Sequence, residues 1–300
     1  MKKSLLLFFL FLLYFILLFY SDTVLSGTKK GLILWFDTII PSLFPFIVLC
    51  KLIPVFLPSC CLLGLLSGYP LGAMLTKESY LLNDNKNPHN FSVLNKYQTL
   101  LGFVNIASPV FICGYVCTSC FAWKNERYLF TLSIYLGTFF SYILCLIFFT
   151  NHQKNSNCHS YSVSQKQSSS KNFSINSLLL DSASSLIVFG GFIILSAILI
   201  EFIQKITFLS PFYKAVFSCM IEFTNGLHLL SHLYQCGNIS KLAASSITVF
   251  FLSFGCFSIF LQTASILHST KLSIKKYIVQ KFLAGLLSVI TFFILESIFF

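Results

Sequence analysis

The sequence is poor in charged residues, and this shortage excludes most soluble folds. Only 10% of its 300 residues are charged, and just 9 of them are Asp or Glu, whereas an ordinary soluble domain carries about 25%. Residues of the types AVILMFWYC make up 56% of the chain, and Phe alone occurs 36 times. No water-soluble packing of one chain of this length hides so much apolar surface. The composition therefore predicts an all-α polytopic membrane protein.

Acidic residues are the scarcer of the two signs, so the net charge is +11 with 20 Lys and Arg residues. In a soluble protein this excess suggests nucleic acid as a partner. Here the basic residues fall mostly in short segments between apolar runs, which is the pattern of cytoplasmic loops. We therefore expect membrane lipid, and no nucleic acid, as a partner.

Catalytic and metal-binding motifs are also missing. There is no Gly-rich nucleotide loop, no pair of catalytic carboxylates and no repeated Cys-x2-Cys pair. His228, His232 and Cys236 share one helical face, but the Glu that follows the first His of a zinc protease is absent. A membrane metalloenzyme built on these residues stays an alternative. We expect a protein that is not an enzyme, with no cofactor and no metal.

Apolar runs and polar segments divide the chain into four parts. Residues 1–30 hold a basic start and the apolar run 5–20, which lacks a clear Ala-x-Ala cleavage site and favours an uncleaved membrane anchor. Residues 31–150 form a first transmembrane repeat with a connecting span. The segment 151–176, rich in Ser, Asn, Gln and Lys, is a polar linker. Residues 177–300 hold a connecting span and a second transmembrane repeat.

Two apolar runs of the first half are broken by residues that disrupt helices. The run at 62–75 is interrupted within SGYPLG at 67–72, and the run at 97–116 is interrupted at 105–109. In lipid every backbone polar group needs an internal partner, so broken segments are tolerated only against protein or a water-filled cavity. Paired breaks of this kind are the best sequence pointer to a transporter's substrate site.

The two halves resemble each other weakly. Gly31-Leu32 aligns with Gly226-Leu227, residues 66–68 align with the break at 252–255, and Lys96-Tyr97 aligns with Lys276-Tyr277. An odd number of crossings per repeat makes the second copy inverted, with sites at the repeat interface. The Lys-rich segments 1–3, 77–96, 151–176 and 271–281 all favour the cytoplasm. They cannot all lie there if every apolar run crosses, so we expect 67–72 to be re-entrant.

These motifs resemble the sporulation integral membrane protein YlbJ family, within the broader group that carries nucleoside-recognition Gate domains. The matching pieces are residues 31–35 and 41–46, SGYPLGA at 67–73, Asn105 with 108–112, and in the second half 253–255 with Ser258 and Gln262. The resemblance covers roughly residues 31–300. It implies a role in endospore formation and transport of dipicolinate, a small aromatic dicarboxylate, across the outer forespore membrane from the mother cell.

A site built on the breaks suits a small anionic solute, because half-helix N-termini and amide or hydroxyl donors attract anions. The candidate substrate-binding residues are Ser67, Gly68, Tyr69, Pro70, Gly72, Asn105, Ser108, Pro109, Ser253, Gly255 and Gln262. Three alternatives stay open: a different solute such as a nucleoside, a non-transporting scaffold of the forespore envelope, and the metalloenzyme. Whether several copies assemble into a homo-oligomer also stays open.

Overall fold

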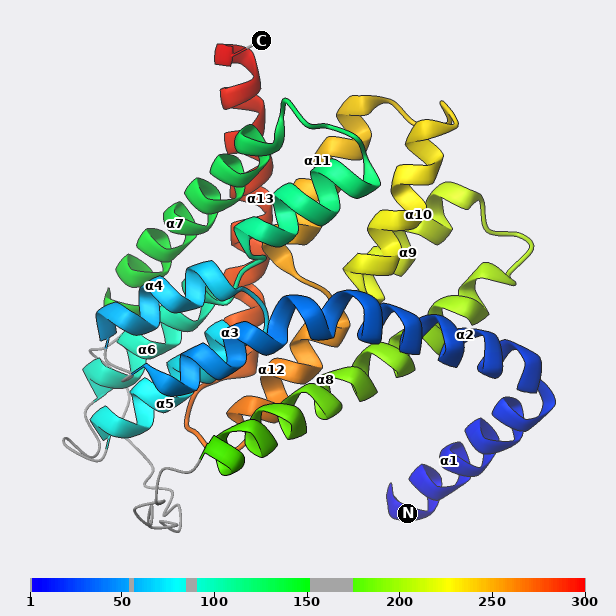
Figure 1. Ribbon diagram of the computed structural model, residues 1–300, viewed down its shortest axis with the longest axis horizontal. Coiled ribbons are helices and arrows are strands. Elements are labelled where there is room, and N and C mark those ends of the chain that lie inside the picture. The colour runs from blue at the N-terminus through cyan, green and yellow to red at the C-terminus, as the bar shows by residue number, and fades with distance from the viewer. Residues whose placement is uncertain (1, 54–56, 85–90, 152–174, 300) are drawn as a thin grey trace.

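The computed structural model describes residues 2–53, 57–84, 91–151 and 175–299 (Figure 1), and within these ranges the chain forms helices and no strand. Among the described residues, five helical stretches are long and apolar enough to cross a bilayer: Ser21–Leu52, Arg127–Phe148, Ile175–Gln204, Lys241–Leu267 and Ile274–Phe299. The predicted all-α polytopic fold is confirmed, and the protein is a multi-pass integral membrane protein.

The first half begins with α1 (Lys2–Phe19) and a long helical run that joins α2 (Ser21–Leu34), a π-helical turn η1 (Trp35–Ile39) and α3 (Ile40–Leu52). Next come two short helices, α4 (Leu57–Ser67) and α5 (Leu71–Asp84), which pack against each other as a hairpin. An interrupted helix follows, made of α6 (Phe91–Val104) and η2 (Phe111–Cys120). The half closes with the long helix α7 (Arg127–Asn151).

The second half repeats this order. It starts with the long helix α8 (Ile175–Gln204) and a hairpin of α9 (Pro211–Ile221) and α10 (Phe223–Gln235). An interrupted helix then combines α11 (Lys241–Phe254) and α12 (Phe257–Leu267), and α13 (Ile274–Phe299) ends the fold. Each half is thus a spanning helix, a hairpin, an interrupted helix and a second spanning helix.

The register of the repeat differs from the one expected from the sequence. Residues 67–72 form a hairpin tip, whose counterpart is the tip at Glu222, whereas 252–255 lie at a helix interruption, whose counterpart is at 105–108. Likewise Lys96 belongs to α6 and Lys276 to α13, which are not equivalent helices. The alignment was wrong because it paired Gly-containing breaks, while the second hairpin turns without a Gly or Pro at its tip.

Equivalent helices run antiparallel, as an inverted repeat requires. Between α7 and α13, Ser141 donates to the Gln280 carbonyl while Thr291 donates to the Ser133 carbonyl. Residue numbers therefore rise along α7 in the direction in which they fall along α13, so the two helices are antiparallel. Between α2 and α8, Gly27 lies against Ile198, whereas the Trp35 indole donates to the Leu186 carbonyl at 3.1 Å. This antiparallel pairing is the arrangement that an inverted repeat requires.

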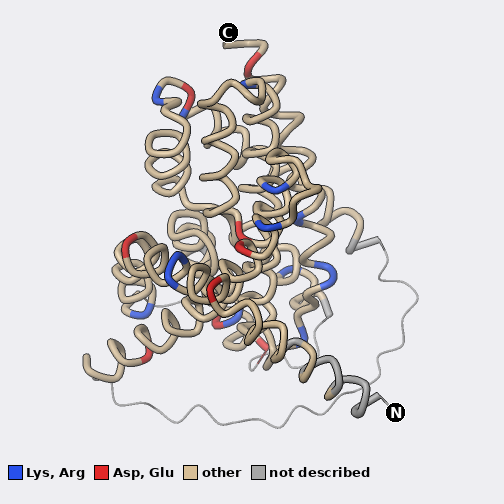
Figure 2. Tube along the Cα trace, turned by 90° about the vertical axis from the view of Figure 1, so that its right-hand side faces the viewer, with Lys and Arg blue, Asp and Glu red and all other residues tan. Residues whose placement is uncertain are grey.

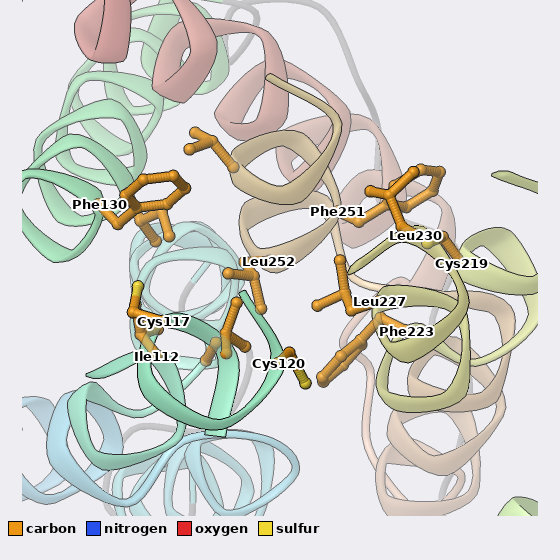
Figure 3. Packing of buried hydrophobic residues seen from close by; sticks show 14 of the residues in the cluster. Ile112, Cys117, Cys120, Phe130, Cys219, Phe223, Leu227, Leu230, Phe251 and Leu252 are labelled. Atoms are coloured by element: carbon orange, nitrogen blue, oxygen red, sulfur yellow. The ribbon is translucent and has the colours of Figure 1, made fainter. Parts of the chain in front are cut away.

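A continuous apolar core joins the two halves. Figure 3 shows Ile112 and Cys117 of η2 and Phe130 of α7 facing Leu252 of α11 and Leu227 of α10 within one buried cluster. Outside this core, large side chains of α8 such as Leu180, Ile187 and Leu195 are more than 60% exposed. Exposed apolar faces of this kind suit lipid rather than water, and Figure 2 shows long stretches of the helices without a charge.

The hairpins solve the topological conflict posed by the lysines. Residues 57–84 turn back at 68–70 as a helical hairpin, which is the shape that a re-entrant segment 67–72 would have. The end of α5 and the middle of α6 meet the connection between α12 and α13, where Lys271 lies 3.7 Å from Asp84 and Gln98 donates to the Ser273 carbonyl. The polar linker falls mostly on residues 152–174, outside the described residues.

Candidate solute site

The tip of the first hairpin reverses the chain within three residues. Gly68 has φ +79, a conformation that favours glycine, and an added Cβ would lie 2.7 Å from the Ser108 backbone nitrogen. The Tyr69–Pro70 peptide bond is cis. Behind the tip, Gly72 lies so close to α6 that a Cβ would meet the Val104 carbonyl at 2.4 Å. The motif SGYPLG therefore seats the hairpin tip directly on the interruption of the neighbouring helix.

The interruption between α6 and η2 is held by Asn105, which is fully buried. Its side-chain oxygen accepts from the Ala73 amide at 3.3 Å, and its side-chain nitrogen donates to Thr263 at 3.2 Å and to the Tyr277 hydroxyl at 2.7 Å. Ser108 begins the next helical segment by accepting from the Phe111 amide. Asn105 thus ties the first hairpin to α12 and α13 of the second half.

The second hairpin turns at Glu222, which is buried between α9 and α10. Its carboxylate accepts from the backbone amides of Thr224 at 2.9 Å and Asn225 at 2.8 Å. An acidic side chain in this position caps the helix and complements the positive end of its dipole. The N-terminus of α10 is therefore occupied by the protein's own carboxylate.

The interruption between α11 and α12 lies at Gly255, which has φ +92 and ψ −159. It is met from the first half by Tyr69, whose hydroxyl donates to the Ser253 carbonyl at 3.2 Å. Beyond the interruption, Gln262 donates to Ser258 at 3.2 Å within α12. Each half therefore contributes one hairpin tip and one interruption to the same region.

A cavity of about 240 Å³ lies where these four elements meet, closed on another side by α3 and α8. Its wall holds six aromatic side chains: Phe46, Tyr69, Phe111, Tyr115, Phe189 and Phe223. It also holds polar side chains: Thr38, Ser42, Ser67, Ser108, Glu222, Thr224, Ser258 and Gln262. A largely apolar cavity with a few convergent polar groups has the character of a small-molecule site.

The predicted residues divide into two groups. Five of them line the cavity: Ser67, Tyr69, Pro70, Ser108 and Gln262. The other six lie around it, in the backbone turns and contacts that shape the tips and interruptions: Gly68, Gly72, Asn105, Pro109, Ser253 and Gly255.

Sequence reasoning missed Glu222 and the aromatic wall. Glu222 was visible as an acid in an otherwise apolar segment, which is a signal for function in a membrane protein. The ring of Phe223 lies 5.4 Å from that of Phe111, and Phe111 stacks on Tyr115 at 5.1 Å. These contacts are not readable from the sequence because Phe is so frequent in every apolar run.

The proposed metal ligands do not form a site in the described residues. No group of three or more His, Cys, Asp or Glu side chains able to hold a metal ion is found among them. Cys236 lies 3.8 Å from the nearest ring nitrogen of His232 at the exposed end of α10. These residues are also not among those that line the cavity.

Comparison with known proteins agrees with the motifs. The chain is similar to the sporulation integral membrane protein YlbJ of Bacillus subtilis (strain 168), with 25% identity over 331 aligned residues, covering 89% of this chain and 78% of the relative. No protein family model matches the chain, and no solved structure matches it. The match to YlbJ supports the family relationship that the motifs indicate.

Proposed function

We propose that this protein is a transporter that acts in sporulation and moves a small aromatic dicarboxylate, dipicolinate, across a membrane. The observation that carries the proposal is the meeting of two hairpin tips and two helix interruptions, one of each from either half, around one cavity. Inverted repeats with discontinuous helices are the architecture in which transporters bind solutes at the repeat interface. The similarity to a sporulation integral membrane protein gives the cellular context.

The chemistry of the cavity supports an aromatic solute. Rings of Tyr69, Phe111 and Phe223 offer faces and edges against which a planar ring packs favourably. The hydroxyl groups of Ser108 and Ser258 offer hydrogen bonds to carboxylate oxygens. Dipicolinate, which the family resemblance implies, combines one such ring with two carboxylates.

A neutral solute such as a nucleoside is the second candidate, and one observation favours it. Among the described residues that line the cavity, Glu222 is the only one with a charged side chain, and none is Lys or Arg. The Glu222 carboxylate and the Gln262 amide can form hydrogen bonds with the hydroxyl groups and ring nitrogens of a nucleoside. A negatively charged carboxylate is less suited to binding a dianion.

Spores supply the first experiment. A strain that lacks this gene would be complemented with the wild-type chain, with Gln262→Met in the cavity wall, or with Lys275→Met at the exposed start of α13. We expect the wild type and Lys275→Met to restore dipicolinate and Gln262→Met to restore less at equal membrane abundance. Normal dipicolinate in spores without the gene would contradict the proposal.

Purified protein in liposomes separates the two solutes. Uptake of labelled dipicolinate would be measured with unlabelled dipicolinate or unlabelled nucleoside as competitor. If labelled dipicolinate is taken up and only unlabelled dipicolinate competes, the result supports the anion. If labelled nucleoside is taken up and only unlabelled nucleoside competes, the result supports the second candidate.

A further inference from the structure

Lys281 is a fully buried basic residue in the last helix. It lies in α13, its side chain is 0% exposed, and it is among the largest fully buried side chains. None of the ion pairs found among the described residues includes it: Lys30–Glu201, Lys241–Glu126 and Lys271–Asp84. An ionisable side chain inside a membrane span is costly to bury and is a functional candidate by default.

The contacts of Lys281 are few for an ammonium group. Its Nζ donates to the Asn105 carbonyl at 3.1 Å, at the C-terminal end of α6 where the helix is interrupted. It also lies 5.1 Å from the centroid of the Tyr69 ring. A lysine has three donors, and the end of a helix offers only about half a unit of negative charge. The carbonyl and the ring therefore compensate this charge only in part.

Tyr69 places that charge beside the cavity. Tyr69 is one of the residues that line the cavity, and the Lys281 Nζ lies within 5.1 Å of the centroid of its ring. The acidic side chain that lines the cavity, Glu222, is held by the amides of α10. Without Lys281 the only ionisable side chain at the cavity would be the acidic Glu222, which does not favour an anion.

We propose that Lys281 is the specificity-determining cation of the cavity, which makes it accept a dicarboxylate rather than an uncharged ring of the same shape. The ammonium offsets Glu222 and, through the Tyr69 ring, attracts the solute's carboxylates. The role is electrostatic and needs no direct contact in the conformation described. This inference rests on the proposed transport of a small aromatic anion.

The test compares two ligands that differ in charge but not in shape. Binding of pyridine-2,6-dicarboxylate and of its neutral diamide would be measured by calorimetry on the full-length protein in detergent. The variants are Lys281→Met, Lys281→Arg and, as a control from the same helix, the exposed Lys275→Met. We expect the ratio of the two affinities to fall about tenfold in Lys281→Met, the effect of one charge-assisted interaction. The ratio stays in favour of the dianion in Lys281→Arg and Lys275→Met.

Several results would overturn the proposal. An unchanged ratio in a folded Lys281→Met protein leaves Lys281 without a role in selectivity while the proposed function stands. Wild-type protein that binds the diamide at least as well as the dianion overturns it without any variant, including the case in which Lys281→Met does not fold. Wild-type protein that binds neither ligand removes the proposed function together with this inference.

Discussion

The hydroxyl of Tyr69, at the tip of the first hairpin, donates to the backbone carbonyl of Ser253 at 3.2 Å across 184 positions of sequence. The bond joins a hairpin of one half to the interrupted helix of the other. It lies beside the cavity, because Tyr69 also forms part of the cavity wall. The tip of one half is thus fixed by a backbone group that the interruption in the other half leaves without a helical partner.

Removing this one hydroxyl tests the link. Tyr69→Phe keeps the ring and loses the hydrogen bond, so we expect the free energy of unfolding to fall by about 1 kcal/mol. We also expect slower solute uptake, since the hairpin tip is no longer fixed. Thermal unfolding in detergent and uptake into liposomes measure the two effects. Tyr213→Phe, which alters a 56% exposed tyrosine of α9, is the control, and equal behaviour of the two variants would contradict the prediction.

Glu222 at the tip of the second hairpin is expected to act as a cap. Glu222→Ala leaves the amides of Thr224 and Asn225 without their partner, which costs about 1–2 kcal/mol. Ser240 caps α11 in the same way, but it is exposed, so water replaces its oxygen in Ser240→Ala. Thermal unfolding of both variants gives the comparison, and the prediction is wrong if Ser240→Ala is the more damaging of the two.

The contact between α2 and α8 depends on glycine. A Cβ at Gly27 would lie 2.6 Å from the Ile198 Cα, so Gly27→Ala forces the two helices apart, at about 1–3 kcal/mol. At Gly191 of α8 a Cβ meets nothing within 4 Å, so Gly191→Ala is expected to be neutral or to stabilise the helix. We expect the unfolding temperature to fall in Gly27→Ala and not in Gly191→Ala, and equal falls in both variants would show that Gly27 does not set this contact.

Asn105 deserves a different experiment from the cavity residues, because it does not line the cavity. Asn105→Ala removes the bonds to Ala73, Thr263 and Tyr277, each worth about 1 kcal/mol. We expect uptake and stability to be lost together. Ser258→Ala, in the cavity wall, loses only the bond from Gln262, so it is expected to weaken solute affinity with a smaller fall in unfolding temperature than Asn105→Ala. A stable, inactive Asn105→Ala protein would contradict this distinction.

Much of the fold could be read from the sequence because membrane helices have a strong signal. The interruptions at 67–72 and 105–109 were visible because Gly and Pro disrupt helices, and the lysine distribution required a re-entrant segment. The partner hairpin was not visible. Glu222 turns the chain in an extended conformation with φ −150 and ψ 114, which any residue adopts, so no Gly or Pro marks the place.

The sequence allowed us to predict which backbone segments form the site, but not which side chains face the cavity. The residues that break helices pointed to the right region, but which side chains face a shared cavity depends on packing between segments far apart in the chain. Asn105 and Ser108 are three residues apart, yet Asn105 faces Thr263 and Tyr277 while Ser108 lines the cavity. Lys281 belongs to the Lys-rich segment 271–281 in the sequence, and its relation to Tyr69 depends on the contact of α13 with the first half.

The hairpins also predict on which side each connection lies. Because 57–84 and 211–235 both turn back, the ends of α5 and α12 lie on one side of the membrane and the end of α10 lies on the other. The basic residues Lys77, Lys271 and Lys275 favour the cytoplasm for the first side.

Alkaline phosphatase fused after Asp84 or Leu267 is therefore expected to be inactive, and phosphatase fused after Gln235 is expected to be active. If residues 57–84 crossed the membrane fully, fusions after Leu52, at the end of α3, and after Asp84 would report opposite sides. That outcome would place the tip of the first hairpin away from the cavity and remove the basis of the site.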